Sequence, residues 1–90
     1  MEVVYSPDAL DDLKYWKKSG NKAILKKIQT LIFAIQESPF EGIGKPEQLK
    51  HSLSGRWSRR IDREHRIVYR VGLEGRNIEI ITIVSLKGHY

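Results

Sequence analysis

The spacing of apolar residues changes once along this 90-residue chain, and the change constrains the possible folds more than any other feature. Before Pro39 the apolar residues recur at the three- and four-residue intervals of a helix. After Gly55 they alternate with polar residues, which is the period of a half-buried strand. The chain is therefore expected to form helices in its first half and a sheet in its second half.

The first half predicts one short strand and two helices. Residues 3–5 are β-like, and Ser6 followed by Pro7 provides an N-cap and a proline at the first helical position. Gly20 is expected to end this helix, and Asn21 can cap the next one. The second helix carries an apolar stripe made of Ile24, Leu25, Ile28, Leu31, Ile32 and Ile35.

The second half predicts a long loop followed by a three-stranded meander. Residues 40–55 contain three glycines and one proline, and a loop of this length in a small domain is often functional. The alternating pattern then predicts strands over residues 57–62, 65–71 and 78–84, joined by turns at 62–65 and 72–76.

Together these elements predict an α+β fold. The expected order is β-α-α-β-β-β, with the two N-terminal helices packed on one face of a mainly antiparallel sheet, in a single domain of residues 1–90. The opposite face of the sheet is expected to be free. Arg60 and Arg66 point to this free face if the alternate residues point to the helices, namely Trp57, Ile61, Ile67 and Tyr69.

The positive charge is concentrated in the second half of the chain. The formal net charge is +5; residues 1–44 contain six lysines and six acidic residues, whereas residues 45–90 contain ten Lys or Arg and five acidic residues. Such a basic half is typical of a protein that binds a polyanion such as RNA. A solvated strand face, on which arginine stems cover apolar surface, would explain the same pattern.

The chain has no cysteine, so it can form neither a disulfide nor a thiolate metal site. Its N-terminal residues are too few and too acidic for a signal peptide, and no apolar run approaches the ~18 residues of a membrane span. We expect a cytoplasmic protein that does not associate with membranes.

Several reaction classes lack the residues that they need. The chain has no Gly-rich phosphate loop, no serine in a nucleophile elbow and no histidine pair at helical spacing. His51, His65 and His89 have no nearby carboxylates arranged as metal ligands. Acyl transfer is therefore unsupported, and we expect neither a metal nor another cofactor.

The remaining polar residues suit the cleavage of RNA by acid-base chemistry. That reaction needs a base for the 2′-hydroxyl, a cation for the phosphorane and an acid for the 5′-oxygen. If the last strand ends beside the strand of Arg66, the C-terminus brings His89 within its reach. The candidates are Glu47 and Lys50 in the loop, Arg60 and Arg66 on adjacent strands, and His89 and Tyr90 at the C-terminus.

Each candidate also has a purely structural interpretation. Glu47 can pair with a neighbouring lysine, Arg66 can be a charged edge residue, and a penultimate histidine is often part of a disordered tail. Trp57 and Tyr69 are better explained as core residues than as platforms for stacked bases. The spacing of these residues does not by itself select them as a site.

A set of specific sequence motifs lies between Pro39 and Arg66. It includes Gly44-Lys45-Pro46-Glu47, Leu49-Lys50-His51, Trp57-Ser58-Arg59-Arg60-Ile61 and Glu64-His65-Arg66, and the chain ends in His89-Tyr90. Together with Asp11-Asp12 and Tyr15-Trp16, these motifs resemble those of the YoeB toxins, a branch of the RelE superfamily of bacterial toxin-antitoxin systems. The resemblance covers nearly the whole chain.

The resemblance implies a microbial-RNase-like α+β fold and a ribosome-dependent mRNA endonuclease that cuts in the ribosomal A site. It also implies silencing by a cognate antitoxin of the YefM (Phd-type) family, and relatives form homodimers. The chain departs from the family pattern in the connection 72–77, which looks longer than in the shortest members, and in the tail 85–88.

The resemblance also implies roles for single residues. Glu47 matches the general base, Arg66 the arginine that stabilises the transition state, and His89 the general acid. Tyr90 matches a terminal tyrosine that helps hold the site and the substrate base. The basic residues expected to bind RNA are Lys50, Arg60 and Arg59.

Three other functions are compatible with a small basic protein of this predicted fold. A ParE-like toxin poisons gyrase and cuts no RNA, but it lacks a constellation of Glu, Arg and terminal His. A non-catalytic protein could bind rRNA or an antitoxin and block translation by occupancy, and a third possibility is a ribonuclease that acts on free RNA.

Overall fold

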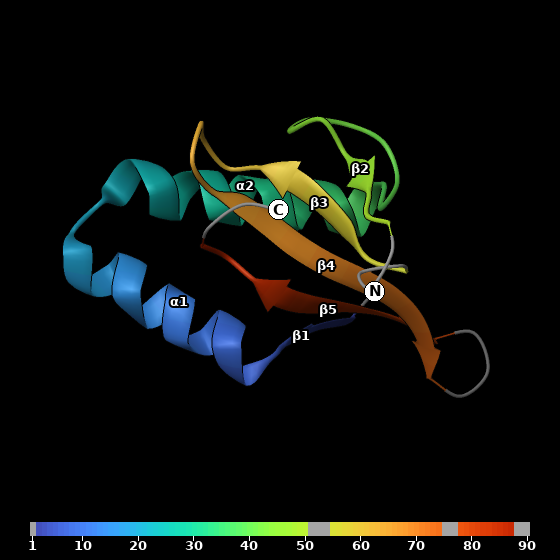
Figure 1. Cartoon of the computed structure of the whole chain (residues 1–90). Helices are drawn as coiled ribbons and strands as arrows, with labels where there is room; N and C mark the ends of the chain where they lie inside the picture. Colours follow the sequence, from blue (N-terminus) through green and yellow to red (C-terminus); the bar gives the residue numbers. More distant parts are fainter. Residues whose placement is uncertain (1, 51–54, 75–77, 88–90) are drawn as a thin grey trace.

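The computed structural model describes residues 2–50, 55–74 and 78–87, with backbone only for 73–74 and 78–85. Within these residues two helices pack against a five-stranded sheet of order β1-β5-β4-β3-β2. Figure 1 shows α2 behind β3 and β4, and α1 beside the end of β5. The elements are β1 (Glu2–Tyr5), α1 (Pro7–Ser19), α2 (Lys22–Glu37), β2 (Glu47–Gln48), β3 (Trp57–Arg60), β4 (Arg66–Glu74) and β5 (Ile78–Ser85).

The predicted signals bound the two helices. The Ser6 side chain accepts a hydrogen bond from the Ala9 amide at 3.0 Å, and Gly20 ends α1 in the left-handed conformation with φ of 73°. Asn21 then caps α2 by accepting from the Ile24 amide at 3.1 Å. Both helix starts and the end of α1 are therefore confirmed.

The sheet is mainly antiparallel, as predicted. β2, β3, β4 and β5 pair antiparallel in that order, and only the pair of β1 with β5 is parallel. Short hydrogen bonds close the turn after β3: the Asp62 carboxylate accepts from the amides of Glu64 and His65 at 2.8 and 2.7 Å. The α+β architecture and its helix-covered sheet are confirmed.

Three details differ from the prediction. Residues 40–55, expected to be loop, contain the short edge strand β2, because Glu47 and Gln48 pair with β3. β3 ends at Arg60 and not at residue 62, because the turn bonds begin at Ile61. β4 continues to Glu74, which pairs with Ile78, so the turn predicted at 72–76 starts too early.

One irregularity lies where β4 faces the end of β5. Tyr69 pairs with Ile83, but the preceding Val68 pairs with Ser85, so β5 contains one extra residue at this point. Such a bulge bends a strand and redirects the residues that follow it. The bulge therefore bends the end of β5 beside Val68 of β4. Val68 lies two residues after Arg66.

The two faces of β3 and β4 have different neighbours. Trp57, Arg59, Ile67 and Tyr69 form the helix face, since Ile67 and Tyr69 belong to the core cluster together with Ile28, Leu31 and Ile35 of α2. Ser58, Arg60, Arg66, Val68 and Arg70 form the opposite face, here called the Arg66 face. Arg60 and Arg66 are placed there as predicted.

The Arg66 face is not free along its whole length. Arg60 and Arg70 are exposed, but Ser58 and Val68 are 0% and 1% exposed. The prediction of a free opposite face is therefore wrong at its centre. Among the described residues, no helix combines the length and the apolar character needed to cross a lipid bilayer.

Candidate functional site

A carboxylate and a guanidinium meet on the Arg66 face. Arg66 Nη1 donates to Glu47 Oε2 at 3.1 Å and to Ser58 Oγ at 3.3 Å. The Glu47 side chain is 64% exposed and the Arg66 side chain only 18%. The arginine is therefore fixed from two sides by the protein, while the carboxylate remains open to a ligand.

The sheet register explains why these residues meet although they are far apart in sequence. Glu47 lies directly opposite Ser58 across β2 and β3, and Arg66 lies opposite Arg60 across β3 and β4. Directly opposed residues share a face, and diagonal neighbours lie within reach of long side chains. The short strand β2, which the sequence did not predict, is thus the element that brings Glu47 to Arg66.

The segment before β2 is held by Arg59, which was predicted from the sequence to bind RNA. Its side chain is fully buried and donates to the carbonyl oxygens of Ser38, Glu41 (2.9 Å) and Ile43 (3.3 Å), as well as to the Tyr69 hydroxyl at 3.1 Å. A side chain that is 0% exposed cannot contact RNA. The prediction for Arg59 is corrected: its guanidinium anchors the chain that leads to Glu47.

Tyr69 completes this anchor. Its hydroxyl accepts from Arg59 Nε and donates to the Pro39 carbonyl oxygen at 2.6 Å. Burial raises the pKa of the Tyr69 phenol above its ordinary value, against the smaller opposing effect of Arg59. The phenol therefore stays neutral and keeps its proton as a donor; Tyr69 is a core residue, as the sequence indicated.

Close approach of the backbone makes Gly44 necessary in this segment. Its φ is +82°, and a Cβ added there would lie 2.8 Å from Leu31 Cδ2 and 3.0 Å from Arg59 Cβ. Its carbonyl oxygen accepts from the Arg60 amide at 2.7 Å. The segment before β2 therefore lies directly against α2 and the end of β3.

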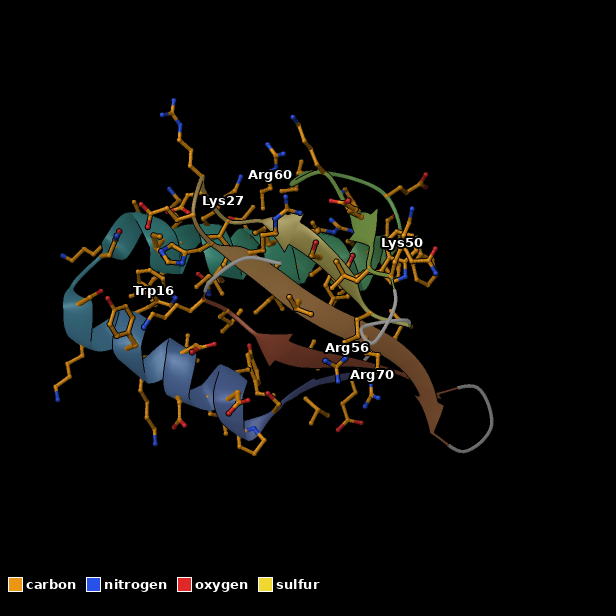
Figure 2. All side chains as sticks on the ribbon, viewed as in Figure 1. Trp16, Lys27, Lys50, Arg56, Arg60 and Arg70 are labelled. Atoms are coloured by element: carbon orange, nitrogen blue, oxygen red, sulfur yellow. The ribbon has the colours of Figure 1, made fainter. Side chains whose placement is uncertain are left out.

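Two further cations flank the pair of Glu47 and Arg66. Figure 2 shows Lys50 beside β2 and Arg60 at the far end of β3. Both are exposed, and they lie on opposite sides of the register pair Glu47 and Ser58. These positions suit contacts with successive phosphates of one strand, and Arg56 and Arg70, also labelled in Figure 2, extend the positive charge.

The C-terminal candidates, His89 and Tyr90, lie outside the described residues. The condition stated for His89, that the last strand ends beside the strand of Arg66, is met because Ser85 pairs with Val68. Leu86, the next residue, is completely buried. Its amide donates to Asp12 Oδ2 at 3.0 Å, and its carbonyl oxygen accepts from Trp16 Nε1 at 2.9 Å.

Three residues of this arrangement were not predicted from the sequence. Ser58 accepts from Arg66, and Asp12 and Trp16 hold Leu86. Asp12 and Trp16 are four residues apart and share a helix face, which could be read from the sequence, but their contact with residue 86 could not. Ser58 gave no such signal, since its role depends on the register of β3 against β2 and β4.

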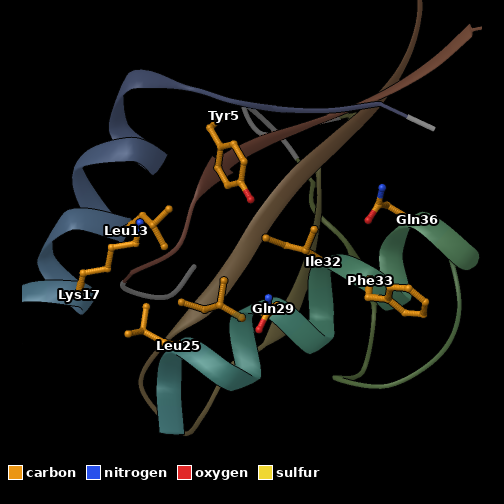
Figure 3. A pocket seen from close by; sticks show the side chains of 9 residues that line it. Tyr5, Leu13, Lys17, Leu25, Gln29, Ile32, Phe33 and Gln36 are labelled. Carbon is orange, nitrogen blue, oxygen red and sulfur yellow. The ribbon is translucent and has the colours of Figure 1, made fainter. Parts of the chain in front are cut away.

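Three hollows of the described chain lie away from the pair of Glu47 and Arg66, one of them between Trp16 and the turn at residues 62–65. An apolar groove of about 540 Å³ runs between α1 and α2 and is lined by residues such as Leu13, Leu25, Ile32 and Phe33 (Figure 3). A basic hollow of about 380 Å³ is lined by Lys27, Lys45, Arg60 and Arg63. Asp62 also borders it, but Asp62 Oδ1 already accepts two backbone amides.

The described lining of the apolar groove contains no Asp, Glu or His, and its titratable groups are the Lys17 amine and the Tyr5 phenol. In the described residues there is also no group of three or more His, Asp or Glu side chains that could hold a metal ion. In the described chain, Glu47 and Arg66 bring a carboxylate and a guanidinium into direct contact on the Arg66 face.

The fold is that of small bacterial toxins. The structure matches a "YoeB/ParE toxin from Agrobacterium tumefaciens" with a TM-score of 0.92 and 38% identity, over 100% of both chains. It also matches a YoeB chain of a dimer from Staphylococcus aureus (TM-score 0.86, 43% identity) and a chain of a YoeB-YefM complex from the same organism (TM-score 0.83, 45% identity). Each covers 100% of this chain and 98% of the other.

The sequence comparisons are more specific. A family model described as the YoeB-like toxin of bacterial type II toxin-antitoxin systems matches residues 5–90. The chain is 54% identical to Toxin YoeB of Escherichia coli (strain K12) over 90 residues, which is 100% of both proteins. The chain therefore belongs to the YoeB family of type II toxins, and the resemblance inferred from its sequence is confirmed.

Proposed function

We propose that this toxin is a ribosome-dependent endoribonuclease that cuts mRNA in the ribosomal A site and thereby inhibits translation. The observation that carries the proposal is the pair of Glu47 and Arg66, which joins an exposed carboxylate to a fixed guanidinium on a basic surface. A base and a phosphate-binding cation side by side are what attack by a 2′-hydroxyl needs.

In the proposed reaction Glu47 removes the proton from the 2′-hydroxyl, and the 2′-oxygen forms a bond to the adjacent phosphorus. Arg66 stabilises the charge of the phosphorane. Within the described chain, Arg66 binds Glu47 and Ser58 through Nη1, and Nε and Nη2 are proposed to donate to the phosphate. The bond from phosphorus to the 5′-oxygen then breaks, and His89 donates a proton to that oxygen.

The products of this reaction are a 2′,3′-cyclic phosphate and a 5′-hydroxyl. Glu47 ends protonated and His89 deprotonated, and exchange with water restores both. Tyr90 is proposed to orient the substrate base, and Lys50 and Arg60 to bind neighbouring phosphates. No step uses a metal ion or another cofactor.

The partners are proposed from the relatives. The match to a chain of a YoeB-YefM complex supports a YefM-type antitoxin that neutralises the toxin. The match to a chain of a YoeB dimer supports a homodimer. The ribosome is proposed as the partner that orders the mRNA backbone against Glu47 and Arg66, and the cytoplasm as the compartment where all of these meet.

The test is cleavage of a short mRNA in the A site of programmed ribosomes under single-turnover conditions. Glu47→Gln keeps the shape of the side chain but removes the base, so the rate should fall by about 10²- to 10⁴-fold while ribosome binding is retained. Glu37→Gln, an exposed carboxylate at the end of α2, is the control and should cut like the wild type.

Mapping of the fragment ends distinguishes the alternatives. New 5′-hydroxyl ends that depend on Glu47 support the proposal. Arrest of translation without new ends would indicate a protein that acts by occupancy, and inhibition of gyrase without RNA cleavage would indicate a ParE-like activity. A fully active Glu47→Gln would remove Glu47 from the mechanism.

A further inference from the structure

Helix α1 holds the backbone of the chain directly after β5. The amide of Leu86 donates to the Asp12 carboxylate at 3.0 Å, and its carbonyl oxygen accepts from the Trp16 indole at 2.9 Å. The backbone N–H and C=O of Leu86 are thus both hydrogen-bonded by two side chains on the same face of α1. Asp12, Trp16 and Leu86 are here called the α1 clamp.

The α1 clamp is tied to the strand that carries Arg66. The Trp16 ring lies edge-on to the ring of His65, with the ring centroids 4.8 Å apart, and His65 directly precedes Arg66. Trp16 is 5% exposed and Leu86 is 0% exposed, so the contact is tightly packed. Outside it, Lys87 Nζ lies 3.8 Å from the centroid of the Tyr15 ring, which holds one more residue of the tail.

The register shows where the held segment begins. Ser85 pairs with Val68, which lies two residues after Arg66 in β4, and Leu86 directly follows Ser85. Three residues span at most about 10–11 Å, so fixing Leu86 limits where His89 can lie. The bulge before Ser85 and the α1 clamp after it together fix the backbone on both sides of Ser85.

Simple packing of Leu86 would not need this arrangement. An apolar side chain at position 86 would fill the core whatever the partners of its backbone, and water could satisfy backbone groups at the end of a strand. Two directional hydrogen bonds from a rigid helix instead fix the position and orientation of the peptide. A fixed peptide is what a catalytic group a few residues away requires, because a misplacement of about 1 Å can lower a rate about 10²-fold.

We propose that Asp12 and Trp16 are positioning residues, which hold Leu86 so that His89 can protonate the leaving 5′-oxygen. The proposal rests on the function proposed above, since it assigns the α1 clamp to one step of that reaction. It extends the site from the Arg66 face to helix α1, whose residues do not touch the RNA in this account.

The test uses variants that loosen the α1 clamp at single hydrogen bonds. Trp16→Phe keeps an aromatic ring beside His65 but cannot donate to Leu86, and Asp12→Ala removes the acceptor for the Leu86 amide. Asp12→Asn keeps an oxygen acceptor and is expected to retain activity close to that of the wild type. Asp11→Ala removes the neighbouring, exposed carboxylate and is the matched control.

The readout compares two mRNAs on programmed ribosomes: one with the natural oxygen at the scissile 5′ position and one with a bridging sulfur there. A thiolate leaves without a proton from a general acid, whereas an alkoxide does not leave readily. Asp12→Ala and Trp16→Phe should therefore lose about 10- to 100-fold on the oxygen substrate, but cut the sulfur substrate within about threefold of the wild type.

Each other result overturns the proposal in a distinguishable way. Equal losses on both substrates would mean that the α1 clamp supports only the fold, and unchanged cleavage of both would mean that it has no role. If the wild type cuts neither substrate, the proposed function itself fails and the positioning role fails with it. If Trp16→Phe does not fold, the Asp12 pair of variants still decides, because Asp12 is only partly buried.

Discussion

Arg59 and Arg60 are neighbours in β3, yet they lie in two different regions of the molecule. Arg59 points into the helix face, is 0% exposed and donates to three backbone carbonyl oxygens and one hydroxyl. Arg60 points to the Arg66 face and is exposed beside the pair of Glu47 and Arg66. The same side chain is part of the architecture on one face and available to a ligand on the other.

Alternate residues of a strand point to opposite faces of the sheet. The face to which an arginine points, and not its residue type, therefore decides whether it supports the fold or the chemistry. A buried guanidinium is costly unless it is well hydrogen-bonded, and each of the three nitrogens of Arg59 donates to at least one neutral oxygen. An arginine on the Arg66 face keeps its charge for a phosphate. Substitutions on the helix face should therefore change stability, and substitutions on the Arg66 face should change activity.

Among the substitutions that compare the two faces through Arg59 and Arg66, the largest effect is expected for Arg66→Gln. The variant loses the cation at the phosphorane, so single-turnover cleavage on programmed ribosomes should fall by about 10²- to 10³-fold. The urea midpoint should stay near that of the wild type, because the partner Glu47 is largely exposed and such an ion pair contributes little to stability. An Arg66→Gln variant that is strongly destabilised but retains its specific activity would show that Arg66 supports the fold and not the chemistry.

Arg59→Met should give the opposite result. It leaves the carbonyl oxygens of Ser38, Glu41 and Ile43 and the Tyr69 hydroxyl without their donor, which should cost on the order of 3–5 kcal/mol in the free energy of unfolding. Urea denaturation followed by circular dichroism measures the loss. A stable Arg59→Met that has lost RNA binding would show that Arg59 contacts RNA after all.

Removal of charge from the basic hollow should have a smaller effect, confined to binding. In a Glu47→Gln background, Arg63→Gln should weaken binding to programmed ribosomes and reduce the slope of log affinity against log salt by about 0.7 to 0.9 for each lost phosphate contact. Lys18→Gln, an exposed charge near the end of α1, is the control. An unchanged slope for Arg63→Gln would exclude this hollow from the RNA contact.

The smallest effect concerns the Tyr69 phenol. Burial raises its pKa in the folded state above the unfolded value of about 10, so the folded protein favours the neutral phenol. The resulting stability is complete below about pH 10 and is lost as the pH rises through the folded pKa. Tyr69→Phe should cost about 1 kcal/mol at neutral pH through its lost hydrogen bonds.

The difference in unfolding free energy between the wild type and Tyr69→Phe should therefore narrow when the pH is raised above about 10. Urea denaturation of both proteins at neutral pH and at about pH 10.5 measures it. A difference that widens with pH would mean that the folded state favours the phenolate, contrary to the burial of Tyr69.

Much of the fold follows from local sequence patterns. Ser6, Pro7, Gly20 and Asn21 mark the helix boundaries because a cap acts on residues only a few positions away. The alternation after Gly55 predicts β3 and β4 and the face to which Arg66 points. β2 was missed, since a two-residue edge strand carries no period and exists only through its pairing with β3.

The site could be predicted only in part, for a similar reason. The family resemblance selected Glu47 and Arg66, which the structure places 3.1 Å apart. Arg59 was expected to bind RNA together with its basic neighbours, because a run of basic residues does not reveal which one is buried. The α1 clamp depends on a contact between residues more than 70 positions apart, Asp12 and Leu86, and no local pattern encodes such a contact.

The central claim is that Glu47 and Arg66 cut mRNA only when a ribosome presents it. Primer extension on one mRNA, incubated with the wild type or Glu47→Gln, with and without programmed ribosomes, tests this claim directly. Discrete new ends are expected, and they should require both the ribosome and Glu47. Ends that appear on free RNA, or ends that persist with Glu47→Gln, would contradict the claim.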